Sequence, residues 1–556
     1  MSTGLFNLIK LFFNRESELT MPKKPLFKKY TFKQKEKYAA AHPAKCAETQ
    51  LKSSPAIKSV AVPDIPAEKP PLNVLFIISE ADPLIKVGGL GDVGGTLPQA
   101  LRALPASLTD GRKIDVRVAI PYHDKLKTDH VPAEWITNYQ IPWRNSFQDV
   151  YLSKASNTEV PMYLVDGDPV RNCGIYNGNP YTDGYKYTFF PIAALELCRA
   201  INWHPDILHA HDWHTAAGIQ KLSEIRPFDP IFKGTRSLYT IHNLPYSGGN
   251  YPDIFTDYDL HPAFNQDIPG WLRTLPMAIG LTSADQISTV SKTYAEEIQT
   301  VEFGHGYETY LSKNKDKLCG IVNGVTMDRW NPATDHILYQ NFSAETLDQR
   351  INNKRMLQQE VGLPQRDNVP LFIMIGRMDA QKGIDLCLQA LRNMRDRDWQ
   401  TIILGTGNPQ IENFCRSLAN EYPDRVRSLI RFDAPLSRRM YAGGDILLMP
   451  SRYEPCGIAQ MIAMLYGCVP VAHATGGLKD TITDPDQNAD NFTGFLFQNA
   501  DVHGTEWAMR RALDFYAKPE VWRQIQIRGM KQDFSWSISA LKYYNLYKEI
   551  LSRKII

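Results

Sequence analysis

Two cationic side chains, Arg377 and Lys382, stand between a predicted strand and a predicted helix. An arginine and a lysine held at that point would suit the negative charge that develops on a departing diphosphate. Further along, Glu454 lies in a turn before a helix, where its carboxylate can accept hydrogen bonds from sugar or ribose hydroxyls. Glu454 could also do no more than cap that helix. These residue types favour a site for a diphosphate attached to a sugar.

Two glycine-rich turns, 86–95 and 474–478, also stand between a strand and a helix. Consecutive glycines let backbone N–H groups approach a ligand, and the helix that follows offers its positive end. Lys86 adds a mobile positive charge to the first turn. A plain tight turn would have the same composition. The first turn matches neither Gly-x-Gly-x-x-Gly nor a P-loop, so it gives little support to a nicotinamide enzyme or an ATPase.

Histidines gather at the ends of two further predicted strands, in His209-Ala210-His211-Asp212-Trp213-His214 and in Thr240-Ile241-His242-Asn243. Alternate residues at a strand end point to opposite faces, and no His-Glu-x-x-His helix is present, so we expect no metal site. Imidazole can donate and accept hydrogen bonds at once, which suits a polyol. Each histidine could instead be a core residue with a purely structural role.

The elements that must position these residues are short apolar runs alternating with helical patterns. Continuous apolar runs are typical of parallel strands buried on both faces, and strand–helix alternation predicts a doubly wound sheet. The pattern stops near residue 320 and restarts, so the predicted fold class is α/β with two Rossmann-like doubly wound domains facing a cleft. Ligands of such folds bind at the carboxyl ends of the strands. The predicted strands are 74–78, 115–121, 162–165, 207–210, 237–241 and 286–290, then 371–375, 401–404, 445–450 and 469–472.

The composition narrows the function classes. The 556 residues include 62 basic and 60 acidic ones, a net charge of +2, which argues against a nucleic-acid partner for the chain as a whole. No run of 18 uncharged apolar residues occurs, so we expect no membrane span. The 8 cysteines form no Cys-x-x-Cys pair, which fits free thiols in a reducing compartment, and we expect a cytoplasmic protein.

The first 71 residues have a different character. Residues 1–70 carry 13 Lys/Arg and 6 Asp/Glu, a difference of +7, and end in a proline-rich run. This composition predicts a disordered basic extension over 1–71. An apolar patch at 5–13 could lie on a membrane surface or a partner, but no small-residue cleavage site follows it, which argues against a secretory signal. A transit peptide, and with it the plastid stroma, is the alternative, although such peptides are richer in Arg and Ser.

In their residues and in their order along the chain, these segments resemble the motifs of the bacterial glycogen synthase and plant starch synthase family, from about residue 72 to residue 550. Further matching segments are Ser79-Glu80, Val290–Ala295, Val322–Val325 and Asp533–Trp536. The resemblance implies an N-terminal acceptor-side domain over 72–318 and a C-terminal nucleotide-sugar domain over 319–533. We expect residues 534–556 to form a helix that packs back on the N-terminal domain.

The resemblance also implies an activity: a retaining glucosyltransferase of the GT-B fold that moves glucose from ADP-glucose to the non-reducing end of an α-1,4-glucan. No metal and no cofactor would take part, and the leaving diphosphate would accept the acceptor's proton. By this analogy Arg377 and Lys382 hold the diphosphate, Glu454 contacts the nucleotide-sugar and His211 contacts the transferred glucose. The substrate-binding residues that it implies are Lys86, Gly88, Gly89, Asp92, Asn243, Thr475, Gly476 and Gly477.

The chain departs from the family pattern on the acceptor side, in the segment 267–280. The family's lysine there aligns with Ala278, and Tyr453 replaces the usual phenylalanine. These departures leave open which glucan is extended. They also leave two alternatives: a transferase that uses UDP-glucose and another acceptor, and a non-catalytic glucan-binding relative. A non-catalytic relative should lose the cationic pair or the carboxylate first, and this chain keeps Arg377, Lys382 and Glu454. The expected partners are therefore a nucleotide-sugar and an α-glucan primer; oligomeric state is not predicted.

Overall fold

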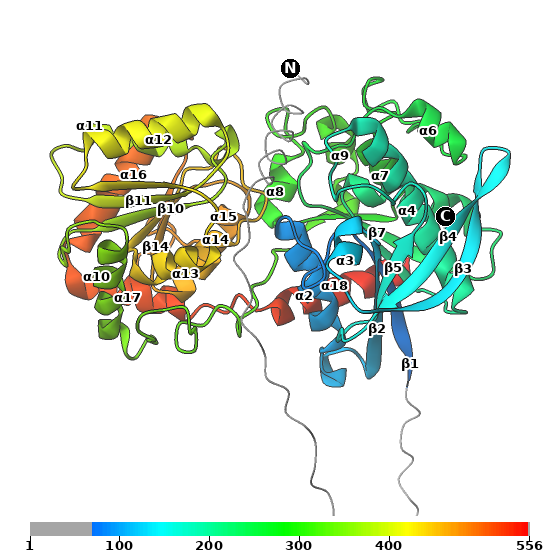
Figure 1. The fold of residues 1–556 in the computed structure, drawn as a ribbon, viewed down its shortest axis with the longest axis horizontal. Coiled ribbons are helices and arrows are strands. Elements are labelled where there is room, and N and C mark those ends of the chain that lie inside the picture. The colour runs from blue at the N-terminus through cyan, green and yellow to red at the C-terminus, as the bar shows by residue number, and fades with distance from the viewer. Residues whose placement is uncertain (1–68, 554–556) are drawn as a thin grey trace, which may run out of the picture. The chain divides into compact units, whose positions relative to one another are not determined.

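A computed structural model describes residues 69–553, which contain two mainly parallel sheets with helices packed on them (Figure 1). Within those residues the first sheet has nine strands in the order β3-β4-β5-β2-β1-β6-β7-β8-β9, antiparallel only where β4 pairs with β3 and β5. The strands are β1 (Lys69–Ile77), β2 (Arg112–Pro121), β3 (Ala133–Trp143), β4 (Ser146–Ala155), β5 (Met162–Asp166), β6 (Ile207–His211), β7 (Arg236–Ile241), β8 (Gln286–Thr289) and β9 (Leu318–Gly320). The helices of this domain are α2 (Gly89–Arg102), α3 (Asp124–Thr128), α4 (Pro180–Ala200), α5 (Ala216–Ile225), α6 (Pro252–Asp257), α7 (Pro276–Ser283), α8 (Lys292–Glu297) and α9 (Glu308–Lys313).

The second sheet is wholly parallel, and within residues 69–553 it has six strands in the order β12-β11-β10-β13-β14-β15. They are β10 (Leu371–Ile375), β11 (Gln400–Gly405), β12 (Val426–Ile430), β13 (Ile446–Met449), β14 (Val469–His473) and β15 (Phe495–Phe497). The helices that follow the first domain are α10 (Arg350–Glu360), α11 (Ile384–Asn393), α12 (Pro409–Glu421), α13 (Ala434–Gly443), α14 (Ala459–Leu465), α15 (Gly476–Thr481), α16 (Val502–Tyr516), α17 (Pro519–Met530) and α18 (Trp536–Ser552). Two doubly wound domains are therefore confirmed.

The apolar runs that were predicted to be strands are strands buried on both faces. In β1, Leu75 and Ile77 lie in the core formed with α4, α5 and α7, whereas Val74 and Phe76 lie in the core formed with α2 and α18. The period-two alternation of a strand sends neighbouring residues to opposite faces, so a strand covered on both sides must be apolar throughout. β10 follows the same rule between α13 on one face and α11 with α16 on the other.

The strand orders place the candidate residues at the switch point of each sheet. β1 lies between β2 and β6, and β10 lies between β11 and β13, so successive crossovers leave each of these strands in opposite directions. A ligand of such a sheet binds outside the carboxyl ends of the two strands at the switch point. In the first domain these ends lead into Glu80 and Asp212; in the second they lead into Arg377 and Glu454.

The boundaries differ in detail from those expected. β1 begins at Lys69, which pairs with Arg112, so residues 69–71 belong to the sheet and not to the N-terminal extension. Residues 1–68, with the apolar patch at 5–13, lie outside the described residues. β9 runs two residues past 318, so the expected boundary between the domains falls inside a strand of the first sheet. α18 packs on α2 of the first domain, and the Tyr547 hydroxyl lies 2.8 Å from His209 Nδ1 in β6.

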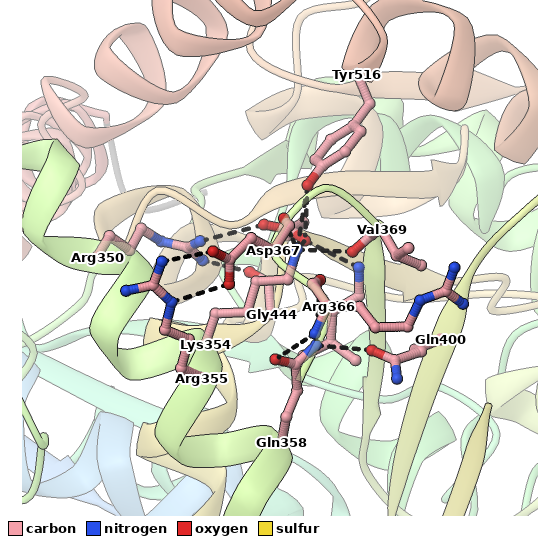
Figure 2. A network of polar contacts seen from close by, with 12 residues as sticks. Arg350, Lys354, Arg355, Gln358, Arg366, Asp367, Val369, Gln400, Gly444 and Tyr516 are labelled. Carbon is pink, nitrogen blue, oxygen red and sulfur yellow. Dashed lines mark hydrogen bonds and ion pairs between the residues drawn. The ribbon is translucent and has the colours of Figure 1, made fainter. Parts of the chain in front are cut away.

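A buried ion network fixes the opposite, amino edge of the second sheet (Figure 2). Lys354 of α10 donates from Nζ to Asp445 Oδ2 at 2.7 Å, and to the carbonyl oxygens of Asp367 and Val369 at 2.9 and 2.7 Å. The same Asp445 oxygen accepts the N–H of Leu371 at 2.9 Å. Lys354 and Asp445 are both buried, and buried Arg350 lies 3.6 Å from the other Asp445 oxygen, so the carboxylate is balanced by two cations. This contact ties the first residue of β10 to the entry of β13.

We expect Lys354→Met to lower the free energy of unfolding by about 3 kcal/mol, the lower end of the usual cost of breaking a buried ion pair. The buried Asp445 carboxylate would lose its nearer cation and keep the longer contact to Arg350 Nη1 at 3.6 Å. Arg355→Met is the matched control one residue along α10. Its ion pair with Asp367 is exposed, so its loss should cost less than about 1 kcal/mol. Urea denaturation followed by circular dichroism compares the two variants. Equal losses would show that the Lys354 network carries no special weight.

Candidate active site

Arg377, Lys382 and Glu454 come together at the carboxyl edge of the second sheet. Lys382 Nζ lies 2.6 Å from Glu454 Oε2, and the same oxygen accepts the hydroxyl of Ser451 at 2.9 Å. Arg377 Nη1 lies 2.8 Å from Asp379, whose other oxygen accepts the N–H of Lys382 at 3.1 Å. Glu454 is buried, whereas the Arg377 side chain is 52% exposed. The guanidinium is thus the part of the cluster most open to a ligand.

The phenol of Tyr246 reaches this cluster from the first domain. Burial alone would lower the pKa of Arg377, but Asp379 and Tyr246 outweigh it and raise that pKa above its ordinary value. Tyr246 follows β7, on the same loop as Asn243. The carboxyl ends of β7 and β10 therefore supply neighbouring side chains.

The Arg377 loop and the Glu454 turn are in backbone contact. Gly383 adopts a left-handed φ of +63°, and a Cβ there would stand 2.1 Å from the carbonyl oxygen of Pro450. The N–H of Arg452 donates to the carbonyl of Gln381 at 2.8 Å, and the Gln381 side chain donates to the carbonyl of Tyr453 at 3.3 Å. Only glycine at 383 permits this approach. The distance between Lys382 and Glu454 is therefore set by the main chain.

The second glycine turn supports the Glu454 turn from behind. A Cβ at Gly476 would stand 2.1 Å from the carbonyl oxygen of Glu454, and one at Gly477 would stand 2.0 Å from that of Cys456. The N–H of Gly476 and the hydroxyl of Thr475 donate to Glu297 Oε1 of the first domain, at 3.0 and 2.9 Å. The N–H of Gly477 donates to the Glu454 carbonyl at 3.2 Å. In this structure these donors serve protein acceptors, so their role toward a substrate stays a prediction.

In the first domain, buried Glu80 shapes the other glycine-rich turn. One carboxylate oxygen accepts the N–H groups of Val87 and of Gly88, the latter at 3.2 Å, and the other accepts the Tyr176 hydroxyl at 2.9 Å. Burial raises the pKa of Glu80 although these bonds lower it. Sequence analysis placed Glu80 in a motif but gave it no role, because its partners are revealed only by the tertiary structure.

The space above the glycine-rich turn is open. A Cβ at Gly88 or Gly89 would meet no heavy atom within 4 Å, so either position leaves room for a ligand. Lys86 Nζ lies 2.6 Å from Asp92 Oδ1, in the first turn of α2. Lys86 and Asp92, both predicted to bind substrate, therefore form a partly exposed ion pair with each other.

The histidines separate into structural and candidate functional residues. His209 has both ring nitrogens satisfied, by the hydroxyls of Tyr547 and Thr240 at 2.8 and 2.7 Å, so the structural alternative holds for it. His211 Nδ1 lies 3.0 Å from His242 Nε2, while its buried Nε2 has no partner within residues 69–553. Burial holds the pKa of His211 well below its ordinary value, so the ring is neutral. The rings of His209 and His211 lie 4.2 Å apart on one face of β6. The expectation that these residues point to opposite faces is wrong, because residues i and i+2 of a strand share a face.

Asp212 is a residue that sequence analysis passed over. It has a φ of +53°, a conformation that a non-glycine residue adopts at a cost. Its Oδ1 accepts the N–H groups of His242 and Asn243 at 2.7 and 3.4 Å, and burial nevertheless raises its pKa to about 7. Asn243 Oδ1 is buried without a partner in the described chain. Asp212 thus shapes the loop that presents His242 and Asn243.

The described part of the chain contains neither a cluster of metal ligands nor a membrane-spanning helix. No group of three or more His, Cys, Asp or Glu side chains in residues 69–553 is arranged to hold a metal ion, and no helix there is both long and apolar enough to cross a membrane. The seven cysteines in that range are all free thiols. Catalysis without a metal or cofactor stays a prediction.

Comparison with known proteins decides the family. Residues 73–313 match the model of the starch synthase catalytic domain, and residues 358–527 match glycosyl transferases group 1. The chain is 36% identical over 487 residues to the glycogen synthase of Bacillus cereus ATCC 14579, covering 86% of this chain and 100% of that relative. It is 37% identical over 493 residues to the Clostridium perfringens strain 13 glycogen synthase, covering 86% and 98%. The chain belongs to the glycogen and starch synthase family.

Solved structures agree with this membership. The catalytic domain of starch synthase IV from Arabidopsis thaliana, bound to ADP and acarbose, superposes with a TM-score of 0.77 at 32% identity and covers 87% of this chain. A sucrose-phosphate synthase from Thermosynechococcus elongatus, at 18% identity and a TM-score of 0.54, shares the fold alone. This synthase family member is a glycosyltransferase of the glycogen and starch synthase type, with the GT-B fold.

Arg377→Ala and Lys382→Ala should each lower turnover about 10²- to 10³-fold, the usual cost of removing one fixed stabiliser of transition-state charge. Initial rates at saturating donor and primer give the measurement. Arg416→Ala is the matched control, since that side chain is 50% exposed and contacts Glu412 and Asn413 of its own helix α12. If Arg377→Ala kept more than half of the wild-type rate, the diphosphate role would belong to another residue.

Proposed function

We propose that this glycosyltransferase moves glucose from ADP-glucose to the non-reducing end of an α-1,4-glucan, with retention of configuration at the anomeric carbon. The observation that carries the proposal is the Arg377–Lys382–Glu454 cluster at the switch point of the second sheet. The Arabidopsis neighbour in the same family was solved with ADP, which is what remains of ADP-glucose once glucose has left.

The diphosphate side rests on the two cations. Arg377 projects a half-exposed guanidinium beside Lys382, and a planar guanidinium can donate two parallel hydrogen bonds to phosphate oxygens. Lys382 is already oriented by Glu454, so it need not be ordered when the donor binds. Both cations would stabilise the charge that grows on the leaving diphosphate.

The sugar side rests on neutral polar groups of the first domain. His211 Nε2 and Asn243 Oδ1 are buried without partners in the described chain, which is costly unless a ligand group completes them. Glucose hydroxyls both donate and accept, so they suit both atoms. A neutral imidazole adds no charge, so it can hold a hydroxyl without competing for the diphosphate.

Retention follows if the acceptor attacks from the face that the diphosphate leaves. The bond between glucose C1 and the diphosphate oxygen breaks, the bond between C1 and the acceptor oxygen forms, and the acceptor's proton passes to the leaving diphosphate. No side chain of the protein needs to act as a base in this scheme. The protein's part is to orient the two substrates and to stabilise charge.

We assign to the acceptor side the segment 267–280, where the chain departs from its family; it covers the end of the loop before α7 and the first residues of α7. Ala278, at the position of the family's lysine, is fully buried in α7 and presents nothing to a ligand. The loop before it leaves Trp271 68% exposed, while its neighbour Leu272 is buried. The N–H of Met277 donates to the carbonyl of Ser247, on the loop after β7, so the segment lies at the same edge of the first sheet as Asn243. An exposed indole held in this way can stack on a sugar ring.

We expect transfer from ADP-glucose to exceed transfer from UDP-glucose. We also expect transfer to survive exhaustive treatment with EDTA, because two fixed cations take the place of a divalent ion. Labelled donor, supplied with glycogen or maltooligosaccharides, gives the measurement. Release of the label as maltose by an α-1,4-specific hydrolase would establish the linkage. Preference for UDP-glucose, or loss of activity that magnesium restores, would contradict the proposal.

Trp271→Ala should raise the KM for a glucan primer several-fold and leave the KM for the donor unchanged, because the ring would contact only the acceptor. Phe432→Ala is the matched control, since that ring is 88% exposed but lies in the second domain. Primer titrations with maltoheptaose compare the two. A primer KM in Trp271→Ala equal to that in Phe432→Ala would show that the 267–280 segment lies outside the acceptor site.

A further inference from the structure

Lys186 is a buried lysine that neither sequence analysis nor the proposed mechanism uses. It lies in α4, where every residue from 186 to 195 is buried, and its side chain has no exposed surface. Its Nζ donates to the carbonyl oxygens of Gly174 and Ile175 at 2.5 and 2.8 Å and stands 4.8 Å from the ring centroid of Tyr187. No carboxylate of residues 69–553 forms an ion pair with it. A lysine in this setting costs more than an apolar residue of the same size, so it calls for a function.

The loop that Lys186 holds is pinned to α4 by two further side chains. The Tyr187 hydroxyl donates to the same Ile175 carbonyl at 2.5 Å, and the Asp183 carboxylate accepts the N–H of Asn177 at 3.0 Å. The residue between these anchors is Tyr176. Its position is therefore set by α4 from both sides.

Tyr176 passes this constraint on to the glycine-rich turn. Its hydroxyl donates to Glu80 Oε1 at 2.9 Å, and Glu80 Oε2 accepts the N–H groups of Val87 and Gly88. A continuous series of contacts thus runs from the ammonium of Lys186, through the 174–176 backbone, Tyr176 and Glu80, to the turn.

We propose that Lys186 is a positioning residue that fixes the glycine-rich turn, and with it the donor, through Tyr176 and Glu80. The inference rests on the proposed function and adds to it that the donor is the ligand of this turn, where Lys86, Gly88 and Gly89 are expected to bind substrate. It goes further in naming a residue remote from the substrate that sets the turn's geometry. An apolar residue at 186 would fill the same volume but could not bind the two carbonyl groups.

The electrostatic setting makes the charge of Lys186 titratable in an accessible range. Burial lowers the pKa of Lys186 to about 8, against the opposing effects of Asp183, Cys173 and Asp124. Above that pH Lys186 is a neutral amine in the folded protein. It then has one N–H donor fewer and no positive charge to attract the two carbonyl oxygens. The titratable or charged groups that face Lys186 are His123, Asp124, Cys173, Asp183, Tyr187 and His214.

Lys186→Met and Lys186→Arg test the proposal in the full chain. In Lys186→Met we expect the KM for ADP-glucose to rise about tenfold or more, with kcat and the KM for primer changed less than threefold. Lys186→Arg keeps the charge and should recover much of the loss. Lys221→Met is the matched control, because that ammonium, in α5, also donates to a backbone carbonyl, but to that of Tyr258 and not to the 174–176 loop. A folded Lys186→Met enzyme with a donor KM within twofold of wild type would overturn the proposal.

The pH profile separates positioning from mere packing. The donor KM of the wild type should rise above about pH 8, whereas in Lys186→Arg it should stay flat to above pH 9, because a guanidinium keeps its proton. Identical profiles in the two enzymes would refute the role of the charge. These two enzymes also decide the matter if Lys186→Met fails to fold.

Hydrogen exchange gives a readout that needs no activity. The amides of Val87 and Gly88 should exchange at least tenfold faster in Lys186→Met than in wild type, while those of β1 and β6 stay unchanged. If the wild type fails to use ADP-glucose but these amides still exchange faster in Lys186→Met, the proposed donor is wrong and the positioning of the turn by Lys186 stands. If donor transfer works and the amides do not respond, that positioning is wrong.

Discussion

Buried carboxylates organise the strand ends on which the site depends. A carboxylate out of water must be surrounded by donors or cations, so each one draws loops together around itself. Glu454 gathers Lys382 and Ser451, and Glu80 gathers the N–H groups of Val87 and Gly88 with the hydroxyl of Tyr176. The turns that the sequence predicts to bind substrate are thus held in shape by buried carboxylates of the protein itself.

A third carboxylate joins the two domains. Glu297, at the end of α8 in the first domain, accepts from Thr475 and Gly476 at the start of α15 in the second. On the same helix, Thr293 donates from its N–H and its hydroxyl to Asp480 of α15, at 2.9 and 2.6 Å. Since α15 also backs the Glu454 turn, the contact that relates the two sheets lies directly behind the candidate site. A change at this joint would therefore reach Glu454 through a few rigid backbone contacts.

The fold could be predicted from the sequence, and so could the clustering of the candidate residues at the strand ends, but their pairing could not. Continuous apolar runs such as Val74–Ile78 indicate buried parallel strands, and the rule for switch points then places Arg377 and Glu454 at the strand ends. The antiparallel strands β3 and β4 were not predicted, because they lie at a sheet edge where the apolar pattern is broken by exposed residues. The roles of Glu80, Asp212 and Lys186 were missed, since each depends on partners from distant segments. Periodicity carries no information on such pairs.

The charges of the donor-side cluster cancel, and this bears on how a diphosphate could be held. Arg377 and Lys382 are offset by Asp379 and Glu454, so the four residues carry no net charge together. A site that attracted phosphate by net charge alone would repel itself when empty and would bind any polyanion. In this cluster Glu454 is buried, Asp379 and Lys382 are part-buried, and the Arg377 guanidinium is exposed, so the most accessible charge is positive. Oriented donors already in place cost no reorganisation when charge develops on the leaving group, which is where electrostatic catalysis gains most. The acidic partners are therefore part of the cationic site: Asp379 and Glu454 hold Arg377 and Lys382 in place, and under the proposed function this is the arrangement that would meet the leaving diphosphate.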